Sequence, residues 1–263
     1  MSDAIKTGAG LPDVNAIGFG APFEWLAGAW SDFRRAPVPC MVYGIVMALV
    51  SAVLTYGIFY SGHAKWIMVL IGGFLFVGPM LAMGLYEAGR SLEAGQKPTL
   101  GQMLFVKTAS TRELAYLGLA LLILYFFWTR IAQLVYALNT FTIHKNTTEF
   151  FQFMLFDPAG HTMAMVGTVM GGAVAFLAYT LVVISAPMLL DRKSDVFRSA
   201  VTSFRSVTKN FGPMLLWAAL IAVLTVGSIL TAFVGMIVVF PLVGLASWRA
   251  YRSLVQGSST DVT

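Results

Sequence analysis

Long apolar runs constrain this sequence more than any other feature. A helix needs about 20 apolar residues to cross the hydrocarbon core of a membrane. Runs of at least that length are Val38–Tyr60, Trp66–Tyr86, Leu114–Leu138 and Thr162–Leu190. The chain is 58% hydrophobic and 11% charged, whereas soluble domains carry about 25% charged residues. The sequence therefore predicts an integral membrane protein.

A further apolar block lies between Lys209 and Arg249 and contains no charged residue. One helix over this block would be about twice as long as the hydrocarbon core of ~30 Å is thick. The block is therefore expected to form two helices with a tight turn near Gly227–Thr231. The predicted fold class is all-α, a polytopic membrane protein whose six transmembrane helices form three hairpins.

The predicted organisation has three parts. Residues 1–37 form a cytoplasmic N-terminal tail with an interfacial helix, and residues 38–255 form the six-helix transmembrane domain. Residues 256–263 form a disordered C-terminal tail.

The basic residues predict the orientation of these spans. Of the 17 lysines and arginines, all but Lys65, Arg130 and Lys145 fall on one side of the predicted membrane. The positive-inside rule assigns that side, with both termini, to the cytoplasm. This bias accounts for the net charge of +5. No basic stripe interleaved with aromatic residues is present, so nucleic acid is not an expected partner.

One phrase occurs twice in the chain. Residues 79–92 read PMLAMGLYEAGRSL, residues 241–254 read PLVGLASWRAYRSL, and a fainter copy, PMLLDRK, begins at Pro187. We interpret the phrase as the cytoplasmic exit of a span, where proline loosens the helix end. Tyr86 and Trp248 would then lie at headgroup depth, with arginine anchors beyond them. Duplication of a hairpin is the favoured origin, and shared composition of span ends is the alternative.

Three segments resemble amphipathic helices that lie in the cytoplasmic interface, namely Ala21–Arg35, Ser194–Phe211 and, more weakly, Thr99–Thr111. The apolar residues at helical spacing are Phe23, Leu26, Trp30 and Phe33 in the first segment, and Val196, Phe197, Ala200, Val201, Phe204 and Phe211 in the second. Such helices could dock anionic lipid or a partner subunit. They could equally be ordinary elbows between spans.

Two sets of residues are candidates for contacts. A small-residue face that would let another helix approach closely comprises Gly167, Gly171, Ala175 and Ala178. Cations that could contact an anion or a lipid headgroup are Arg130, Arg198, Arg205 and Lys209. Arg130 stands out because it lies within an apolar run, where a charge marks a functional site or reaches out to the interface.

Neither a catalytic residue nor a cofactor or metal site is predicted. The histidines His63, His144 and His161 fall on the outer side, together with Glu149 and Asp157. Their spacing is irregular and matches no common metal-ligand pattern. Whether the histidines converge in space is left open.

Several stretches carry a resemblance to a known family. These stretches are GPMLAMGLYEAGRSLEAG, SAPMLLDR, GPMLLWAALIAVL and FPLVGLASWRAYRSLV. They resemble a family of uncharacterised bacterial integral membrane proteins with a domain of unknown function and six predicted spans. Members often carry the automatic label "cytochrome c oxidase subunit I". The resemblance implies a bacterial inner-membrane location and a loose association with the respiratory chain.

The residues argue against the catalytic part of that label. A catalytic oxidase subunit holds its haems and copper with histidines on its helices, and this chain has 3 histidines, all near loops. The last span of the family commonly reads GHATWHAYR, whereas this chain reads GLASWRAYR, with Leu245 and Arg249 in place of the histidines.

The expected function is that of a non-catalytic accessory or assembly subunit of a membrane complex. The resemblance implies a respiratory terminal oxidase or supercomplex as the partner. Besides lipid and such partner subunits, no other partner is expected. The alternative is a small transporter or lipid-handling protein, since prolines near span ends are typical of broken-helix transporters. Arg130 would then face a cavity.

Overall fold

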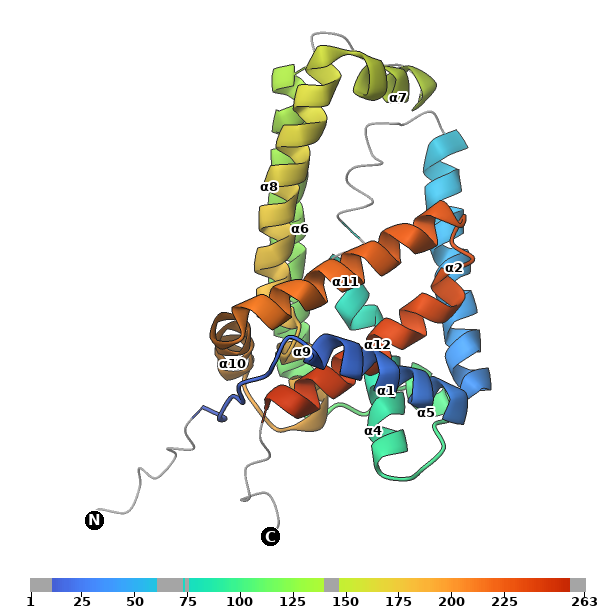
Figure 1. The fold of residues 1–263 in the computed structure, drawn as a ribbon, viewed down its shortest axis with the longest axis vertical. Helices are drawn as coiled ribbons and strands as arrows, with labels where there is room; N and C mark the ends of the chain where they lie inside the picture. The colour runs from blue at the N-terminus through green and yellow to red at the C-terminus, as the bar shows by residue number, and fades with distance from the viewer. Residues whose placement is uncertain (1–10, 61–72, 74–75, 140–146, 256–263) are drawn as a thin grey trace, which may run out of the picture.

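The computed structural model describes residues 11–60, 73, 76–139 and 147–255, and within these ranges the regular structure is helical (Figure 1). The helices are α1 (Ala21–Arg35), α2 (Pro37–Tyr60), α4 (Met83–Glu93), α5 (Leu100–Leu104), α6 (Thr111–Asn139), α7 (Thr147–Phe156), α8 (Pro158–Val182), α9 (Ser185–Asp191), α10 (Val196–Lys209), α11 (Phe211–Leu230) and α12 (Met236–Leu254). The all-α class is confirmed.

Four helices in the described part are long and apolar enough to cross a membrane, namely α2, α6, α11 and the continuous stretch Pro158–Asp191 formed by α8 and α9. Within the expected span Trp66–Tyr86, residues 66–72, 74 and 75 fall outside the described residues, and the described part reaches the start of α4. The expected sixth span corresponds to α12, which has 19 residues with Pro241 inside it and Arg252 in its last turn. It is not among the four. The described structure thus supports a membrane protein with several spans.

The helices take two main directions (Figure 1). α6 and α8 pack along each other and form the tallest part of the molecule, with α7 across one end. α10 is seen end-on at the other end, so its axis lies across that of α6 and α8. Both described ends of the chain lie at the α10 end, where Val14 forms an antiparallel bridge with Val255.

The long charge-free block forms two helices, as expected. α11 ends at Leu230 and α12 begins at Met236. The turn between them lies slightly later than the sequence predicted. Ala232 and Phe233 take left-handed φ values of 51° and 68° there, which reverses the chain direction.

α12 lies at the centre of the molecule and contacts α1, α2, α4, α9 and α11. Small residues let its neighbours come close. A Cβ added to Gly44 of α2 would overlap the carbonyl oxygen of Ile237 in α12. A Cβ on Gly244 of α12 would lie 2.6 Å from the side chain of Leu85 in α4. Backbone-to-backbone contact of this kind is how membrane helices gain packing energy without a hydrophobic driving force between them.

The three copies of the repeated phrase lie in α4, α9 and α12, and these helices contact one another. Its aromatic residues Tyr86 and Trp248 are buried inside the protein, and their depth in the membrane stays a prediction. Tyr86 is 4% and Trp248 is 2% exposed. The Trp248 ring lies over Gly89, whose added Cβ would be 2.7 Å from it. The phrase is therefore a packing motif, because its small residues accept the large side chains of another copy.

α8 and α9 are separated by a break at Val183–Ile184, one turn before Pro187. Proline lacks the N–H that would bond to the carbonyl of Val183, and its ring clashes with that carbonyl. The hydroxyl of Ser203 in α10 enters the gap. It donates to the carbonyl of Thr180 at 2.7 Å and accepts from the N–H of Ile184 at 3.2 Å. Backbone groups that would be orphaned in an apolar setting are thereby satisfied.

Gly44→Ala should lower the free energy of unfolding by about 2 kcal/mol, because the new methyl group meets a backbone carbonyl that cannot rotate away. The matched control is Gly57→Ala on the same helix, where an added Cβ has no atom within 4 Å. Thermal unfolding of both variants in detergent tests this. Equal midpoints would show that α2 and α12 do not cross closely at Gly44.

Ser203→Ala should lower the free energy of unfolding by about 2 kcal/mol, because it leaves a buried carbonyl and a buried N–H without a partner. Ser206→Ala is the control. Its equally buried hydroxyl donates only to the carbonyl of Thr202 in its own helix, so its loss should cost less. Chemical unfolding in micelles compares the two, and a smaller effect for Ser203→Ala would contradict the role of its hydroxyl in the break.

Candidate functional site

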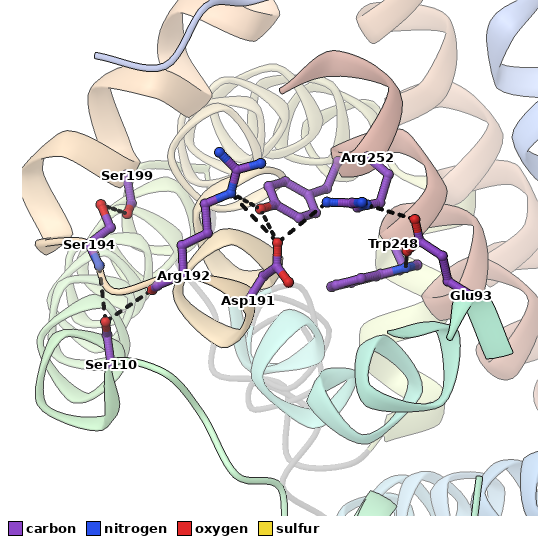
Figure 2. Close-up of polar contacts among 9 residues, drawn as sticks. Glu93, Ser110, Asp191, Arg192, Ser194, Ser199, Trp248 and Arg252 are labelled. Carbon is purple, nitrogen blue, oxygen red and sulfur yellow. Dashed lines mark hydrogen bonds and ion pairs between the residues drawn. The ribbon is translucent and has the colours of Figure 1, made fainter. Parts of the chain in front are cut away.

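The densest polar cluster links α9 to α12 (Figure 2). The hydroxyl of Tyr251 donates to Oδ2 of Asp191 at 2.7 Å and accepts from Nε of Arg192 at 2.8 Å. Arg252 lies 3.6 Å from the same carboxylate oxygen. Asp191 ends α9 and Tyr251 is in the last turn of α12, so the cluster joins two helix ends.

Arg252 extends this cluster to α4. Its Nε donates to Oε1 of Glu93 at 3.0 Å, and the indole N–H of Trp248 donates to Oε2 of Glu93 at 3.1 Å. Figure 2 shows Arg252 between the carboxylates of Asp191 and Glu93. We call these residues, with Tyr251 and Arg192, the polar clamp. The clamp ties together the ends of the three helices that carry the repeated phrase.

Tyr251 is fully buried within this clamp. Burial, together with the charge of Asp191, raises the pKa of Tyr251 above the ordinary value of a tyrosine. The guanidinium carbon of Arg192 lies 5.7 Å from the centre of the ring, where a cation is attracted to the π face. Tyr251 is therefore a neutral hydrogen-bond donor that links Asp191 and Arg192.

A second polar group connects the start of α6 to the α9–α10 loop. The Ser110 hydroxyl donates to the carbonyl of Arg192 and accepts from the N–H of Ser194, both at 3.1 Å. Glu113 accepts from the N–H of Val196 at 2.8 Å. The negative charge of this carboxylate is stabilised by the partial positive charge at the N-terminal end of α10.

An ion pair with a buried carboxylate joins α1 to α12. Asp32 is 4% exposed and accepts from Nε of Arg249 at 2.7 Å. This hydrogen bond raises the pKa of Arg249. The guanidinium lies against Gly28, whose added Cβ would be 2.6 Å from it. Arg249 and Leu245 occupy the positions where the family described above commonly has histidine. Here Arg249 pairs with Asp32, and Leu245 is fully buried.

The N-terminal segment is fastened to two helix ends. The N–H of Asn15 donates to the carbonyl of Leu254 at 2.9 Å. Asn210, at the α10–α11 junction, accepts from the N–H of Ile17 and donates to the carbonyl of Asn15, both at 2.9 Å. Carbonyls at the end of α12, which have no partner within a helix, are satisfied by this segment.

The predicted small-residue face lies along α8 and turns partly toward α6. Its residues are Gly167, Gly171, Ala175 and Ala178. A Cβ on Gly171 would lie 2.8 Å from the ring of Trp128. A Cβ on Gly167 would be 3.9 Å from Val135. Ala178 is buried and Ala175 is half-buried. The neighbour of this face in the described structure is therefore α6 of the same chain.

The predicted cations do not converge on one site. Arg130 is exposed on α6 and donates to the side chain of Gln133 at 3.2 Å. Arg198, Arg205 and Lys209 lie on α10, near the opposite end of the molecule (Figure 1). Lys209 donates to the carbonyl of Val14 at 2.6 Å.

Of the three histidines, only His161 is among the described residues. It is exposed, and its Nε2 lies 2.8 Å from the carbonyl oxygen of Leu155. His63 and His144 fall outside the described ranges, as does the C-terminal tail. Within those ranges, no group of three histidine, cysteine, aspartate or glutamate side chains could hold a metal ion.

Sequence reasoning missed Asp32, Asp191 and Tyr251. Glu87 is buried, and its Oε2 lies 2.6 Å from Arg90. An acidic residue in a segment otherwise rich in basic residues was the available signal. Such an acid is costly to bury without a partner. Asp32 and Asp191 accordingly pair with arginines of another helix, whereas Glu87 pairs within α4.

These observations define a polytopic α-helical membrane protein held together at one end by paired charges. Residues 67–191 match the model of a family described as "Predicted integral membrane protein (DUF2189)". The chain is thus similar to a family of integral membrane proteins of unknown function, and the match covers just under half of it. The matched segment ends with α9, so the similar stretches in α11 and α12 lie beyond it. Neither a curated protein nor a solved structure matched the chain significantly.

Tyr251→Phe should lower the free energy of unfolding by about 2 kcal/mol, because Asp191 loses a donor in a buried cluster. Tyr116→Phe, at an exposed tyrosine of α6, should change the free energy of unfolding little.

Since the pKa of Tyr251 is raised in the fold, the contribution of Tyr251 to stability persists below about pH 10 and falls as the pH rises above that value. The stability of Tyr251→Phe should therefore decline less steeply in alkali. If the stabilities of the wild type and of Tyr251→Phe fell equally steeply above about pH 10, this contribution of Tyr251 would be contradicted.

Proposed function

We propose that this protein is a non-catalytic accessory or assembly subunit of a larger membrane complex. One observation carries the proposal. The most apolar stretches of α2, α6 and α11 are only 22%, 17% and 22% buried within the chain, against 67% for Pro158–Asp191. Most residues of these three stretches are thus not buried by the described part of the chain and can contact lipid or the helices of another subunit.

The chemistry of the polar clamp supports the same proposal. Asp191 and Glu93 of the clamp are paired with arginine, as is Asp32 in the separate pair between α1 and α12. A carboxylate that serves as an acid, a base or an ion ligand needs access to its substrate. These groups instead join helix ends to one another.

The partner we propose is a respiratory terminal oxidase or its supercomplex. This choice rests on the family resemblance in the sequence and on no contact in the structure. We also propose a location in the bacterial inner membrane, with both termini in the cytoplasm and six crossings. The bridge between Val14 and Val255 supports an even number of crossings, because it keeps the two ends on the same side. The distribution of basic residues supports the orientation.

Affinity purification of a tagged full-length chain from gently solubilised membranes tests the proposal. Native gels, mass spectrometry and a haem spectrum of the purified material should show stoichiometric migration with a haem-bearing oxidase. Migration as a haem-free single species would contradict the oxidase partner, and absence of any stoichiometric membrane protein would contradict the subunit role.

Bulky substitutions can then map the docking face. Lipid tolerates an added indole, whereas a close helix interface does not. Exposed pairs suited to replacement by tryptophan are Leu49 and Val53 on α2, Leu119 and Ile123 on α6, and Val223 and Val226 on α11. One pair should abolish co-purification while the other two retain it. Retention by all three variants would show that none of these positions touches the partner.

The second candidate function is transport or lipid handling. The break between α8 and α9 favours it, because discontinuous helices line the sites of many transporters. Arg130, however, lies on the exposed side of α6. An uptake assay with Arg130→Gln in proteoliposomes tests whether this residue lines a transport path. Loss of uptake with an unchanged fold would assign it to a transport path, and unchanged uptake would remove it from one.

A further inference from the structure

The helix α10 has its polar face inside and its apolar face outside. Its fully buried residues are Ser199, Thr202, Ser203 and Ser206. Its outer face carries Phe197, which is 80% exposed, with Phe204 at 52% and Val201 at 43%. In water this arrangement would expose two phenyl rings to solvent, which costs free energy. A surrounding of acyl chains removes that cost.

The position of α10 fits the boundary between acyl chains and headgroups. Its axis lies across that of α6 and α8 (Figure 1), as expected of a helix in the plane of the membrane. Its apolar surface continues past its end, because exposed Phe211 begins α11 and the ring of Phe19 lies over Gly212. Phe19 is itself largely exposed.

A stripe of cations runs along one edge of this apolar face. Arg198, Arg205 and Lys209 are spaced so that they lie within about 40° of one another around a helix with 3.6 residues per turn. Arg205 is exposed, and its hydrogen bond to another side chain in the described part of the chain is made by its backbone carbonyl, which accepts from Thr208. Arg198 lies 3.9 Å from Asp195, and its side chain is 38% exposed.

We propose that the outer face of α10 binds an anionic phospholipid. The headgroup phosphate lies against Arg198 and Arg205, and the acyl chains lie against Phe197, Val201 and Phe204. Charge complementarity selects an anionic lipid over a zwitterionic one, since each basic side chain near the surface favours the anionic headgroup. The exposed phenyl rings favour a lipid over a soluble acidic partner. The inference does not depend on the proposed subunit role.

The bound lipid also has a structural consequence. The inner face of α10 fills the α8–α9 break through Ser203 and meets Glu113 of α6 at its first N–H. A ligand that binds only when α10 is seated stabilises the folded chain by mass action. Anionic lipid should therefore raise the thermal midpoint of the whole protein.

The test uses the full chain in nanodiscs of phosphatidylcholine alone and of equal parts phosphatidylcholine and phosphatidylglycerol. Native mass spectrometry measures how much of each lipid the protein retains, and thermal unfolding measures the midpoint. The wild type should retain phosphatidylglycerol preferentially and unfold at a higher temperature in the mixed discs. Arg198→Gln with Arg205→Gln should lower that preference about fivefold for each cation removed.

The matched control is Lys97→Gln with Lys107→Gln, which removes the same charge from exposed positions beside α5. It should keep both the lipid preference and the midpoint shift. Equal loss in both double variants would overturn the proposal in favour of diffuse surface charge. Retention in the α10 variant would overturn it outright. Inorganic phosphate added to the phosphatidylcholine discs should not reproduce the shift, and an equal shift would assign the site to a free anion.

Because arginine removal could disturb α10, unfolding in phosphatidylcholine alone provides the check on the fold. An unchanged midpoint there, with the anionic shift lost, is the expected result. Arg205→Lys keeps the charge and should retain most of the lipid preference, whereas its complete loss would point to a structural role of the guanidinium rather than to lipid binding.

Discussion

The close contact of α12 with α2 and α4 is the interaction on which the rest of the structure depends. Lipid chains are as apolar as the side chains of these helices, so burial alone gives little reason for helices to associate. Gly44 and Gly244 allow side chains and backbone to meet at distances that a methyl group would prevent. α1, α9 and α11 then pack around the helix that this contact holds in place.

Ion pairs between helices fix the arrangement that close packing allows. The ends of α4, α9 and α12 carry Glu93, Asp191, Arg192 and Arg252, and the α1–α12 contact carries Asp32 and Arg249. Helix packing is tolerant of sliding, whereas directional hydrogen bonds fix one register. The same end holds α10, whose hydroxyl face closes a helix break and whose phenyl face is turned outward. One end of the molecule is thus fixed by many polar contacts, while most residues in the apolar stretches of α2, α6 and α11 are not buried by the described part of the chain.

The sequence predicted the long helices well, because a charge-free run of the right length has few alternatives in a membrane. It also predicted that the block after Lys209 must fold back on itself. It did not predict that Tyr86 and Trp248 are buried in the protein, because composition assigns such residues equally to the lipid interface or to a buried contact. Only the facing Gly89 decides for burial of Trp248. The serines of α10 were similarly ambiguous, since a polar face is usually turned to water. Ser203 is buried instead, because Pro187 interrupts the helix between α8 and α9 and the Ser203 hydroxyl fills that break.

The sequence by itself determined that this is an integral membrane protein and that it is helical. These properties follow from local composition, which acts over a single helix. The tertiary structure alone decided which residues form the polar clamp, which face of α10 is turned outward and where Arg130 lies. Each of these depends on residues far apart in the chain, such as Asp32 and Arg249 or Thr180 and Ser203, and a contact between them exists only once the helices have packed.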